Sequence, residues 1–322
     1  MKAFVTGGTG FIGGRVAAGL RARGDEVVAL VRTPERATRL AALGCTLVAG
    51  DLDDVGAIRR GVAGCDAAFH VAAVYRVGVP AGERASILDI NVGGTERVLD
   101  AAIDAGVARV VHVSTVNAFG NTAGQVVDET YRRPDGDFLS VYDESKYRAH
   151  QAALERIARG APVIIVQPCA VYGPGDTSEL GIIVEQARTG KLRFVSFPSM
   201  GIAMAHVDDI AAGILLAHDR GRIGEAYVLG GEITTMRQLV TAAAQAAGRR
   251  PPRLSMPGLM IKASIPLAPV VTRVMGLPPN LRELIRASDG VTYWARDDKA
   301  RRELGYHARD LRTGLSQTFA TA

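Results

Sequence analysis

The chain has 322 residues, 48% of them hydrophobic and 22% charged, a composition that excludes a disordered or collagen-like protein and predicts a globular one. The formal net charge is only +5, and the basic residues are scattered without interleaved aromatic residues, so we expect no nucleic-acid partner. Three widely spaced cysteines indicate buried free thiols in a reducing compartment, and the start MKAFVTGG leads into a strand-like segment rather than a signal peptide, so we expect a cytoplasmic protein.

Short β-branched runs alternate with helix-length segments through the first half of the chain. The predicted strands cover residues 2–6, 26–31, 46–48, 67–71, 109–113 and 162–166, and the main predicted helices cover residues 11–23, 84–105 and 142–157. Because the strands are apolar on both faces, we predict an α/β fold with a doubly wound parallel sheet, the Rossmann arrangement, and a smaller C-terminal α/β substrate lobe. We expect residues 1–172, joined by 206–230, to form the nucleotide-binding domain, and residues 173–205 and 231–322 to form the lobe.

A glycine-rich turn follows the first predicted strand. Gly7, Gly10 and Gly13 are spaced three apart there, with Phe11 and Ile12 between the last two. Glycines at this place allow a tight turn and let a pyrophosphate approach the backbone at the N-terminus of the next helix. The turn therefore predicts a dinucleotide-binding site.

The end of the second predicted strand indicates which dinucleotide is bound. Arg32 stands where a carboxylate would hydrogen-bond the ribose 2′-hydroxyl of NAD, and Thr33 with Pro34 predicts the start of a helix. On that helix Arg36 and Arg39 lie three apart on one face. Three guanidinium groups suit a phosphomonoester, so we expect NADP(H) rather than NAD(H), although an arginine-rich helix facing solvent would give the same pattern.

Asp51 and Leu52 close the third predicted strand. A carboxylate there can accept a hydrogen bond from the adenine amino group, but an aspartate at a strand end is also a common helix cap. The sequence leaves both roles for Asp51 open.

The fifth predicted strand ends in two hydroxyl residues, Ser114 and Thr115. Ligands bind at the carboxyl ends of strands in doubly wound sheets, so either hydroxyl is placed to hold a substrate carbonyl oxygen. His112 lies within that strand and is expected to be a packed histidine. We expect no metal site, because the six histidines show no ligand spacing.

Tyr142 and Lys146 lie four residues apart, on one face of a predicted helix. The chain has only five lysines, so this pairing is unlikely to arise by chance. A nearby ammonium favours the phenolate form and lowers the pKa of a tyrosine, which suits a general acid or base. We expect Tyr142 to exchange the proton and Lys146 to adjust its pKa.

The motifs together resemble one family over essentially the whole chain. The motifs are the glycine turn, Asn91-Val92-x-Gly94-Thr95, Ser114-Thr115, Tyr142-x-x-x-Lys146, Pro168-x-x-Val171-Tyr172-Gly173-Pro174, His206-Val207-Asp208-Asp209 and the stretch 299–306. Their order and register resemble the extended short-chain dehydrogenase/reductase (NAD-dependent epimerase/dehydratase) family, most closely its dihydroflavonol 4-reductase-like branch.

The resemblance assigns roles to individual residues. It implies that Thr115 is the catalytic hydroxyl, with Ser114 as the alternative, and that Lys146 also holds the nicotinamide ribose. It implies that Arg32 with Arg39 binds the 2′-phosphate. Further cofactor contacts that it implies are Val71, Ala72, Ala73, Pro168 and Val171. The family's dimer implies a homodimer formed by the helices 84–105 and 142–157.

Departures from other branches narrow the substrate. The stretch 200–205 lacks the arginine with which members acting on nucleotide sugars bind a pyrophosphate. Val116-Asn117 replaces the acidic pair of the 4,6-dehydratases, and Gly120 replaces the asparagine with which plant flavonoid reductases bind a catechol. The expected pocket is apolar, with the substrate contacts Val74, Tyr75, Phe119 and Met204, and with Phe194, Phe197 and Met200 nearby.

We therefore expect an NADP(H)-dependent oxidoreductase that reduces an apolar aldehyde or ketone, or oxidises the corresponding alcohol. A nucleotide-sugar epimerase with retained NAD and a non-catalytic NADP-binding regulator are the alternatives. The apolar segment 254–277 is interrupted by three prolines and Lys262, which disfavours a membrane span, and it is core, a lid or a membrane-surface contact.

Overall fold

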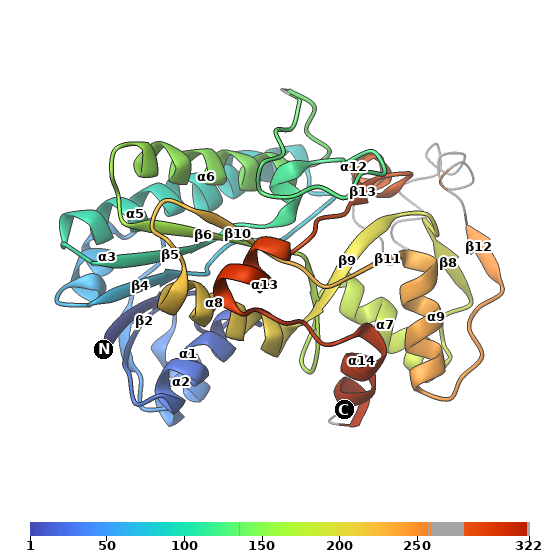
Figure 1. Cartoon of the computed structure of the whole chain (residues 1–322), viewed down its shortest axis with the longest axis horizontal. Helices are drawn as coiled ribbons and strands as arrows, with labels where there is room; N and C mark the ends of the chain where they lie inside the picture. Colours follow the sequence, from blue (N-terminus) through green and yellow to red (C-terminus); the bar gives the residue numbers. More distant parts are fainter. Residues whose placement is uncertain (135, 257, 259–279, 321–322) are drawn as a thin grey trace.

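The computed structural model describes residues 1–134, 136–256, 258 and 280–320 (Figure 1). Its centre is a seven-stranded parallel sheet in the order β10-β6-β5-β4-β1-β2-β3. The strands are β1 (Lys2–Thr6), β2 (Glu26–Val31), β3 (Thr46–Ala49), β4 (Ala67–His70), β5 (Arg109–Val113), β6 (Val163–Pro168) and β10 (Ala226–Leu229). The predicted α/β fold with a doubly wound parallel sheet is confirmed.

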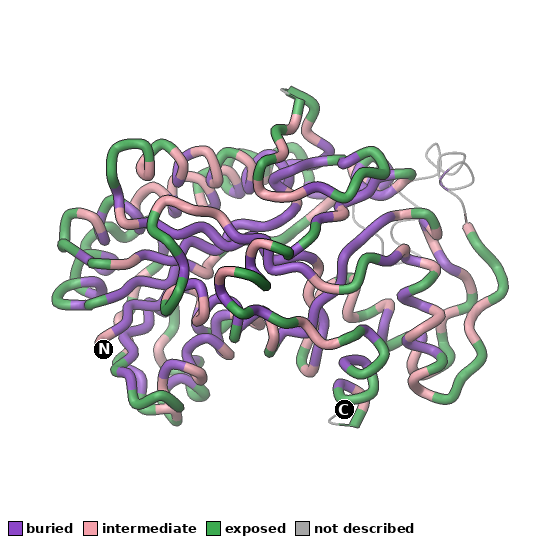
Figure 2. Tube along the Cα trace, in the orientation of Figure 1, coloured by how far each residue is buried: buried purple, intermediate pink, exposed green. Residues whose placement is uncertain are grey.

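Helices cover both faces of this sheet. On one face lie α1 (Gly13–Ala22), α2 (Thr38–Ala42), α8 (Val207–Arg220) and α13 (Asp298–Leu304), and on the other lie α3 (Val55–Val62), α5 (Gly94–Asp104) and α6 (Val141–Ala158) (Figure 1). The inner strands of the sheet are almost entirely buried, as Figure 2 shows in purple, whereas the edge strand β3 is partly exposed. In β1, Phe4 and Val5 are both fully buried and belong to the cores on opposite faces. An uninterrupted apolar strand is stable only in such a central, two-sided position.

A smaller lobe follows the sixth strand. Its sheet places β9 (Gly201–His206) between β11 (Glu232–Thr235) and β13 (Thr292–Tyr293), and β7 (Ala170–Tyr172) also pairs with β9. The remaining lobe elements are α7 (Glu179–Thr189), β8 (Phe194–Ser196), α9 (Met236–Ala246), β12 (Leu254–Met256), α12 (Leu281–Ser288) and α14 (Leu311–Ala320). Residues 257 and 259–277 of the apolar segment lie outside the described residues.

The predicted helix 84–105 is not a regular α-helix. It begins as α4 (Arg84–Leu88), passes through a π-helical segment (Asp89–Gly93) and continues as α5. The π-helical segment brings Asn91 to the interior, where it is buried.

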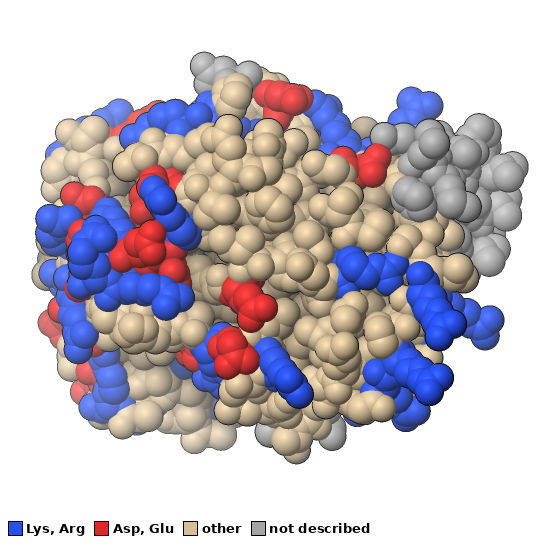
Figure 3. Space-filling view, turned by 45° about the vertical axis from the view of Figure 1, so that its right-hand side comes forward, with Lys and Arg blue, Asp and Glu red and all other residues tan. Residues whose placement is uncertain are grey.

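Charged side chains on the face shown in Figure 3 lie in separate groups, with acidic and basic residues intermixed over part of that face. Among the described residues, no helix has the length and hydropathy needed to cross a membrane, and no cluster of three or more metal-ligating side chains occurs. Cys45, Cys65 and Cys169 are buried free thiols, as predicted.

Candidate functional site

The glycine turn lies directly against the end of β4. Gly7 has φ +74, and a Cβ on it would lie 2.7 Å from the backbone nitrogen of Ala72. A Cβ on Gly13 would lie 2.2 Å from the carbonyl oxygen of Gly7, so α1 can start this close to the turn only at a glycine. No side chain caps α1 and no acidic residue lies in its first turn. Its N-terminus is thus open to an anion at Phe11 and Ile12.

The three arginines near the turn lie differently from the prediction. Pro34–Arg36 forms a short 3-10 turn, Ala37 is not helical (ψ 37), and α2 starts at Thr38. Arg36 and Arg39 therefore do not share a helix face, because the chain changes direction between them. Arg32, Arg36 and Arg39 are all exposed, and in the described part of the chain none makes an ion pair. A Cβ built on Gly14 would lie 3.9 Å from Nη1 of Arg39, which places that guanidinium beside the first turn of α1.

Asp51 follows β3 and is exposed, and its Oδ1 accepts a hydrogen bond from the backbone nitrogen of Leu52 (2.8 Å). Asp54, not Asp51, caps α3 by accepting a bond from Ala57 (2.8 Å). Because that role belongs to Asp54, Asp51 is free of it. Leu52 is buried, and its carbonyl accepts a bond from Nε of Arg97 (2.6 Å).

A buried pair of histidines lies on the neighbouring strands β4 and β5. His70 is hydrogen-bonded to Thr6 (2.8 Å) and Thr95 (3.0 Å) and stacks on His112. Burial and the charge of Lys146 lower the pKa of His70 to about 3, and burial holds the pKa of His112 well below its usual value. Both rings are therefore neutral and serve packing. The segment 71–73 follows directly, and the nitrogen of Ala72 donates to Thr6 Oγ1 (3.3 Å).

The two hydroxyl residues after β5 have different surroundings. Ser114 Oγ is hydrogen-bonded to Nδ1 of His150 (3.0 Å) on α6. Thr115 is buried, donates to the carbonyl oxygen of Pro168 (3.3 Å), and its hydrogen bond to Tyr142 lowers the pKa of that phenol. The structure thus brings Thr115, and not Ser114, together with Tyr142.

Tyr142 lies in the first turn of α6, which starts at Val141 because Ser140 Oγ accepts a bond from the nitrogen of Asp143 (3.0 Å). Burial raises the pKa of Tyr142 above its usual value, with a further contribution from Tyr75. The predicted lowering is therefore wrong: desolvation of the phenolate has the largest effect, and Lys146 is not among the groups that lower this pKa.

Lys146 is buried one turn further along α6, and its Nζ donates to the carbonyl oxygen of Val113 (3.0 Å). Burial lowers the pKa of Lys146 to about 8. The ammonium thus lies at the last residue of β5. Val171, expected near the cofactor, is half-buried in β7, where it pairs with Ala205 of β9.

The segment after β4 covers the phenol. The Tyr75 ring is 49% exposed and meets the Tyr142 ring edge to face. Asn91 holds this segment by accepting a bond from the nitrogen of Val74 (2.7 Å) and donating to its carbonyl oxygen (3.0 Å). Asn91 also donates to Ser145 Oγ (2.9 Å). Its only signal in the sequence is the Asn-Val-x-Gly-Thr motif.

The apolar residues expected in the substrate pocket lie in different environments. The Tyr75 ring meets the Tyr142 ring, and Val74 packs against a small apolar cluster that includes Val141. Phe119 is buried against Tyr131. Met204 is fully buried in the lobe core, which alternation along the strand did not reveal, because every residue of β9 is buried.

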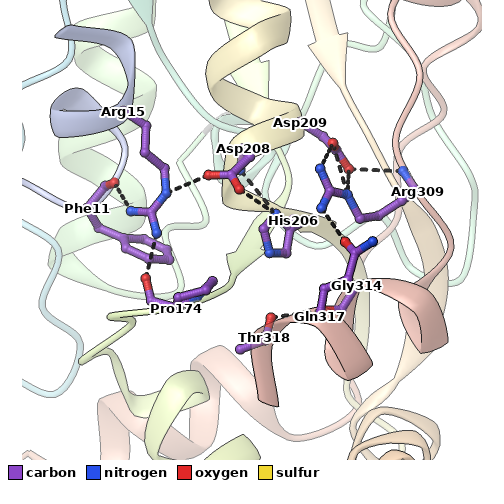
Figure 4. A network of polar contacts seen from close by, with 10 residues as sticks. All are labelled: Phe11, Arg15, Pro174, His206, Asp208, Asp209, Arg309, Gly314, Gln317 and Thr318. Carbon is purple, nitrogen blue, oxygen red and sulfur yellow. Dashed lines mark hydrogen bonds and ion pairs between the residues drawn. The ribbon is translucent and has the colours of Figure 1, made fainter. Parts of the chain in front are cut away.

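A polar network joins the nucleotide turn to the lobe (Figure 4). Arg15 of α1 donates to the carbonyl oxygens of Phe11 (2.9 Å) and Pro174 (2.6 Å) and pairs with Asp208 (2.7 Å). The next residue of α8, Asp209, pairs with Arg309 (2.6 Å), which precedes α14. The sequence offered the Val-Asp-Asp motif but no partner for either carboxylate, since both partners are distant in the chain.

Comparisons with known proteins show the family of this chain. The model of the NAD dependent epimerase/dehydratase family matches residues 3–230. The chain is 35% identical to a 4-hydroxy-2-methyl-3-oxo-4-farnesyl-3,4-dihydroquinoline-1-oxide ketoreductase of Stigmatella aurantiaca, over 96% of this chain and 92% of the relative. It is 33% identical to a putative dihydroflavonol 4-reductase of Synechocystis sp., over 97% and 92%. The crystal structure of gox2253 is 34% identical and superposes with a TM-score of 0.85, covering 99% of this chain and 96% of that one.

Proposed function

Because the chain belongs to the extended short-chain dehydrogenase/reductase family, described also as the NAD dependent epimerase/dehydratase family, we propose that it is an NADP(H)-dependent carbonyl reductase. It reduces the aldehyde or ketone group of an apolar small molecule, or oxidises the corresponding alcohol. The observation that carries this proposal is the convergence of Thr115, Tyr142 and Lys146 at the carboxyl end of β5, across from the glycine turn.

Each of the three side chains has a distinct role. Thr115 donates a hydrogen bond that orients the carbonyl oxygen, and Tyr142 Oη transfers its proton to that oxygen. When bound, NADPH supplies the hydride that the carbonyl carbon accepts. Lys146 stabilises negative charge on Tyr142 as the proton leaves and holds the ribose of the cofactor. Burial keeps the phenol protonated before the reaction, which suits a general acid.

The arginines favour the phosphorylated cofactor. Arg32 and Arg39 are exposed cations, Arg39 lies beside the first turn of α1, and the end of β2 carries no carboxylate to repel a 2′-phosphate. A phosphate dianion accepts charge-assisted hydrogen bonds from guanidinium groups. Arg36 faces solvent on the 3-10 turn and is the weakest of the three candidates. Asp51, which does not cap α3, serves the adenine amino group.

An apolar substrate fits the surroundings of Tyr142. Val74 and Tyr75 supply apolar surface, and β9 (Gly201–His206) presents no arginine to a pyrophosphate. The relatives named above as a farnesyl quinoline-oxide ketoreductase and as a putative dihydroflavonol 4-reductase both bear the names of carbonyl reductases. These features count against the nucleotide-sugar epimerase, which requires a clamp for two phosphates.

The test is a panel of apolar aldehydes and ketones, with NADPH and NADH compared, together with UDP-sugars. We expect NADPH-dependent turnover of apolar carbonyls, and Tyr142→Phe to lower kcat by about 100-fold to 10,000-fold with NADPH affinity nearly unchanged. Tyr147→Phe, five residues along the same helix, is the matched control. Turnover of a UDP-sugar without any carbonyl reduction, or near-normal kcat in Tyr142→Phe, would overturn the proposal.

A further inference from the structure

A buried ion pair lies next to Tyr142. Arg133 and Asp143 are 4% and 1% exposed in their side chains, and two parallel contacts join them, Nη1 to Oδ1 (2.7 Å) and Nη2 to Oδ2 (3.2 Å). Asp143 follows Tyr142 in the first turn of α6, whereas Arg133 belongs to the segment 120–140 that connects β5 to α6. The pair therefore fastens an irregular connection to the turn of helix that carries the phenol.

The guanidinium of Arg133 is held on every side. Its Nη2 donates to the carbonyl oxygen of Asp137 (2.8 Å), and its faces lie over the rings of Phe138 (4.9 Å) and Tyr147 (5.1 Å). A Cβ on Gly120 would lie 2.9 Å from its Cζ, so only a glycine leaves room for the guanidinium at the start of the segment. A planar, stacked and bidentate arginine fixes geometry in a way that lysine does not.

Asp143 is bonded as fully as its partner. Its Oδ2 also accepts a bond from the nitrogen of Leu139 (2.8 Å), and its own nitrogen donates to Ser140 Oγ (3.0 Å). Moving two charges out of water costs free energy, and their mutual attraction often does no more than offset that cost. A contribution to stability is therefore a weak explanation for such a pair. The pair instead fixes the orientation of the first turn of α6 relative to the segment 120–140.

We propose that Arg133 and Asp143 are positioning residues, which hold the first turn of α6 against the segment 120–140 and thereby fix the phenol of Tyr142 for proton transfer. This inference rests on the proposed function. In the described part of the chain, the hydrogen bonds of the two side chains lie within the segment 120–140 and α6, and none reaches the glycine turn or the arginines at the end of β2.

The charge of Asp143 also acts on the phenol. The carboxylate contributes to the raised pKa of Tyr142, and the guanidinium of Arg133 lies 2.7 Å from that carboxylate. The other titratable groups that face this region are Tyr75 after β4, Lys146 and Tyr147 on α6, Tyr293 on β13, and Glu283 on α12, which bonds the nitrogen of Val141. All of them remain when Arg133 or Asp143 is replaced.

The experiment compares Arg133→Met, Asp143→Asn, their double variant and Arg133→Lys with the wild-type enzyme. The rate of alcohol oxidation is measured against pH, because Tyr142 must lose its proton first and the rate then rises with pH through its pKa. Arg133→Met leaves an uncompensated carboxylate, so we expect the rise to move up by about 0.5–1 pH unit; Asp143→Asn leaves a cation, so we expect a move down by a similar amount.

The double variant separates orientation from charge. It leaves no unpaired buried charge, so it folds where a single variant fails, and its pH profile returns close to that of the wild type. Its kcat should still fall by about tenfold, with the KM for NADPH within about twofold, because the turn of α6 has lost its anchor. Arg133→Lys keeps the positive charge but not the bidentate geometry, so it should show the wild-type pH profile and only part of the wild-type kcat.

The outcomes are distinct. If the double variant keeps wild-type kcat, or if both folded single variants shift the profile in the same direction, the positioning proposal is overturned while the proposed function stands. If the wild-type enzyme binds NADPH but turns over no carbonyl or alcohol, the proposed function fails and the positioning proposal falls with it. A fall in NADPH affinity that matches the loss of kcat shows a general structural defect and also overturns it.

Discussion

The Tyr75 ring meets the Tyr142 ring edge to face, with the ring centroids 4.7 Å apart and the planes at 85°. Tyr75 is half exposed whereas Tyr142 is buried, so the outer ring covers the inner phenol. Asn91 fixes the preceding residue, Val74, through both its nitrogen and its carbonyl oxygen. The cover is therefore anchored on the π-helical segment.

Replacement of Tyr75 tests whether this ring contributes to substrate binding. An edge-to-face pair contributes about 0.5–1.5 kcal/mol beyond area burial. We expect Tyr75→Ala to raise the KM for an apolar ketone about tenfold, with the KM for NADPH unchanged, and Tyr75→Phe to behave like the wild type. Steady-state kinetics on both variants measure this KM. If Tyr75→Phe raises it as much as Tyr75→Ala does, the hydroxyl and not the ring contributes to substrate binding.

Lys146 gives a dependence of stability on pH. Burial lowers its pKa to about 8, whereas in the unfolded chain it is near 10.5. Between these values the unfolded chain binds the proton and the folded chain does not, so the free energy of unfolding rises with pH, by at most about 1.4 kcal/mol per unit.

We expect Lys146→Met to abolish this rise, measured by urea denaturation at pH 7.5, 8.5 and 9.5 with no cofactor present. The exposed Lys191→Met is the control and should follow the wild type. A wild-type stability that runs parallel to Lys146→Met over the whole range would contradict the assignment.

The arginines at the end of β2 test cofactor selection. Hydrogen bonds to a charged group contribute about 1.5–3 kcal/mol each. We therefore expect Arg32→Ala and Arg39→Ala each to weaken NADPH binding by about 10-fold to 100-fold, with NADH binding within about twofold of wild type. Fluorescence titration with both cofactors measures the ratio, and Arg188→Ala in the lobe is the control. If the ratio of NADPH to NADH affinity is unchanged in both variants, neither arginine binds the 2′-phosphate.

Two glycines with similar backbones provide a matched comparison. Gly7 has φ +74 and Gly106 has φ +70, but a Cβ on Gly7 would lie 2.7 Å from the nitrogen of Ala72, whereas nothing lies within 4 Å of one on Gly106. We expect Gly106→Ala to lower the free energy of unfolding by about 1–2 kcal/mol, the cost of the left-handed conformation alone. Gly7→Ala should lose more, together with NADPH binding. Denaturation and titration of both variants check this, and equal losses would show that the contact with Ala72 is unimportant.

Much of the fold was predictable because its signals are local. Six strands of the central sheet were placed to within about two residues, since an apolar strand flanked by glycine turns is recognisable from its own residues. The spacing of Tyr142 and Lys146 also follows from the helical period alone. The glycine turn was predictable for the same reason, because a single strand-to-helix connection contains all of it.

What the sequence could not decide depends on residues that are distant in the chain. Ser114 Oγ bonds His150 of α6, whereas Thr115 Oγ1 bonds the carbonyl oxygen of Pro168, and neither contact can be read from the sequence. The predicted helix face of Arg36 and Arg39 is interrupted at Ala37, whose backbone is not helical. The burial of Met204 was not predictable, because a fully buried strand has no alternation that separates its two sides.

The sequence by itself determined the parallel sheet, the glycine turn after its first strand and the placement of Tyr142 and Lys146 on one helical face, because periodicity and turn chemistry are properties of short segments. Only the tertiary structure decided the electrostatic state of that pair. The pKa of Tyr142 is raised and that of Lys146 is lowered by burial, which is the sum of contacts from many elements. The Arg133–Asp143 pair beside them likewise exists only once the segment 120–140 has folded onto α6.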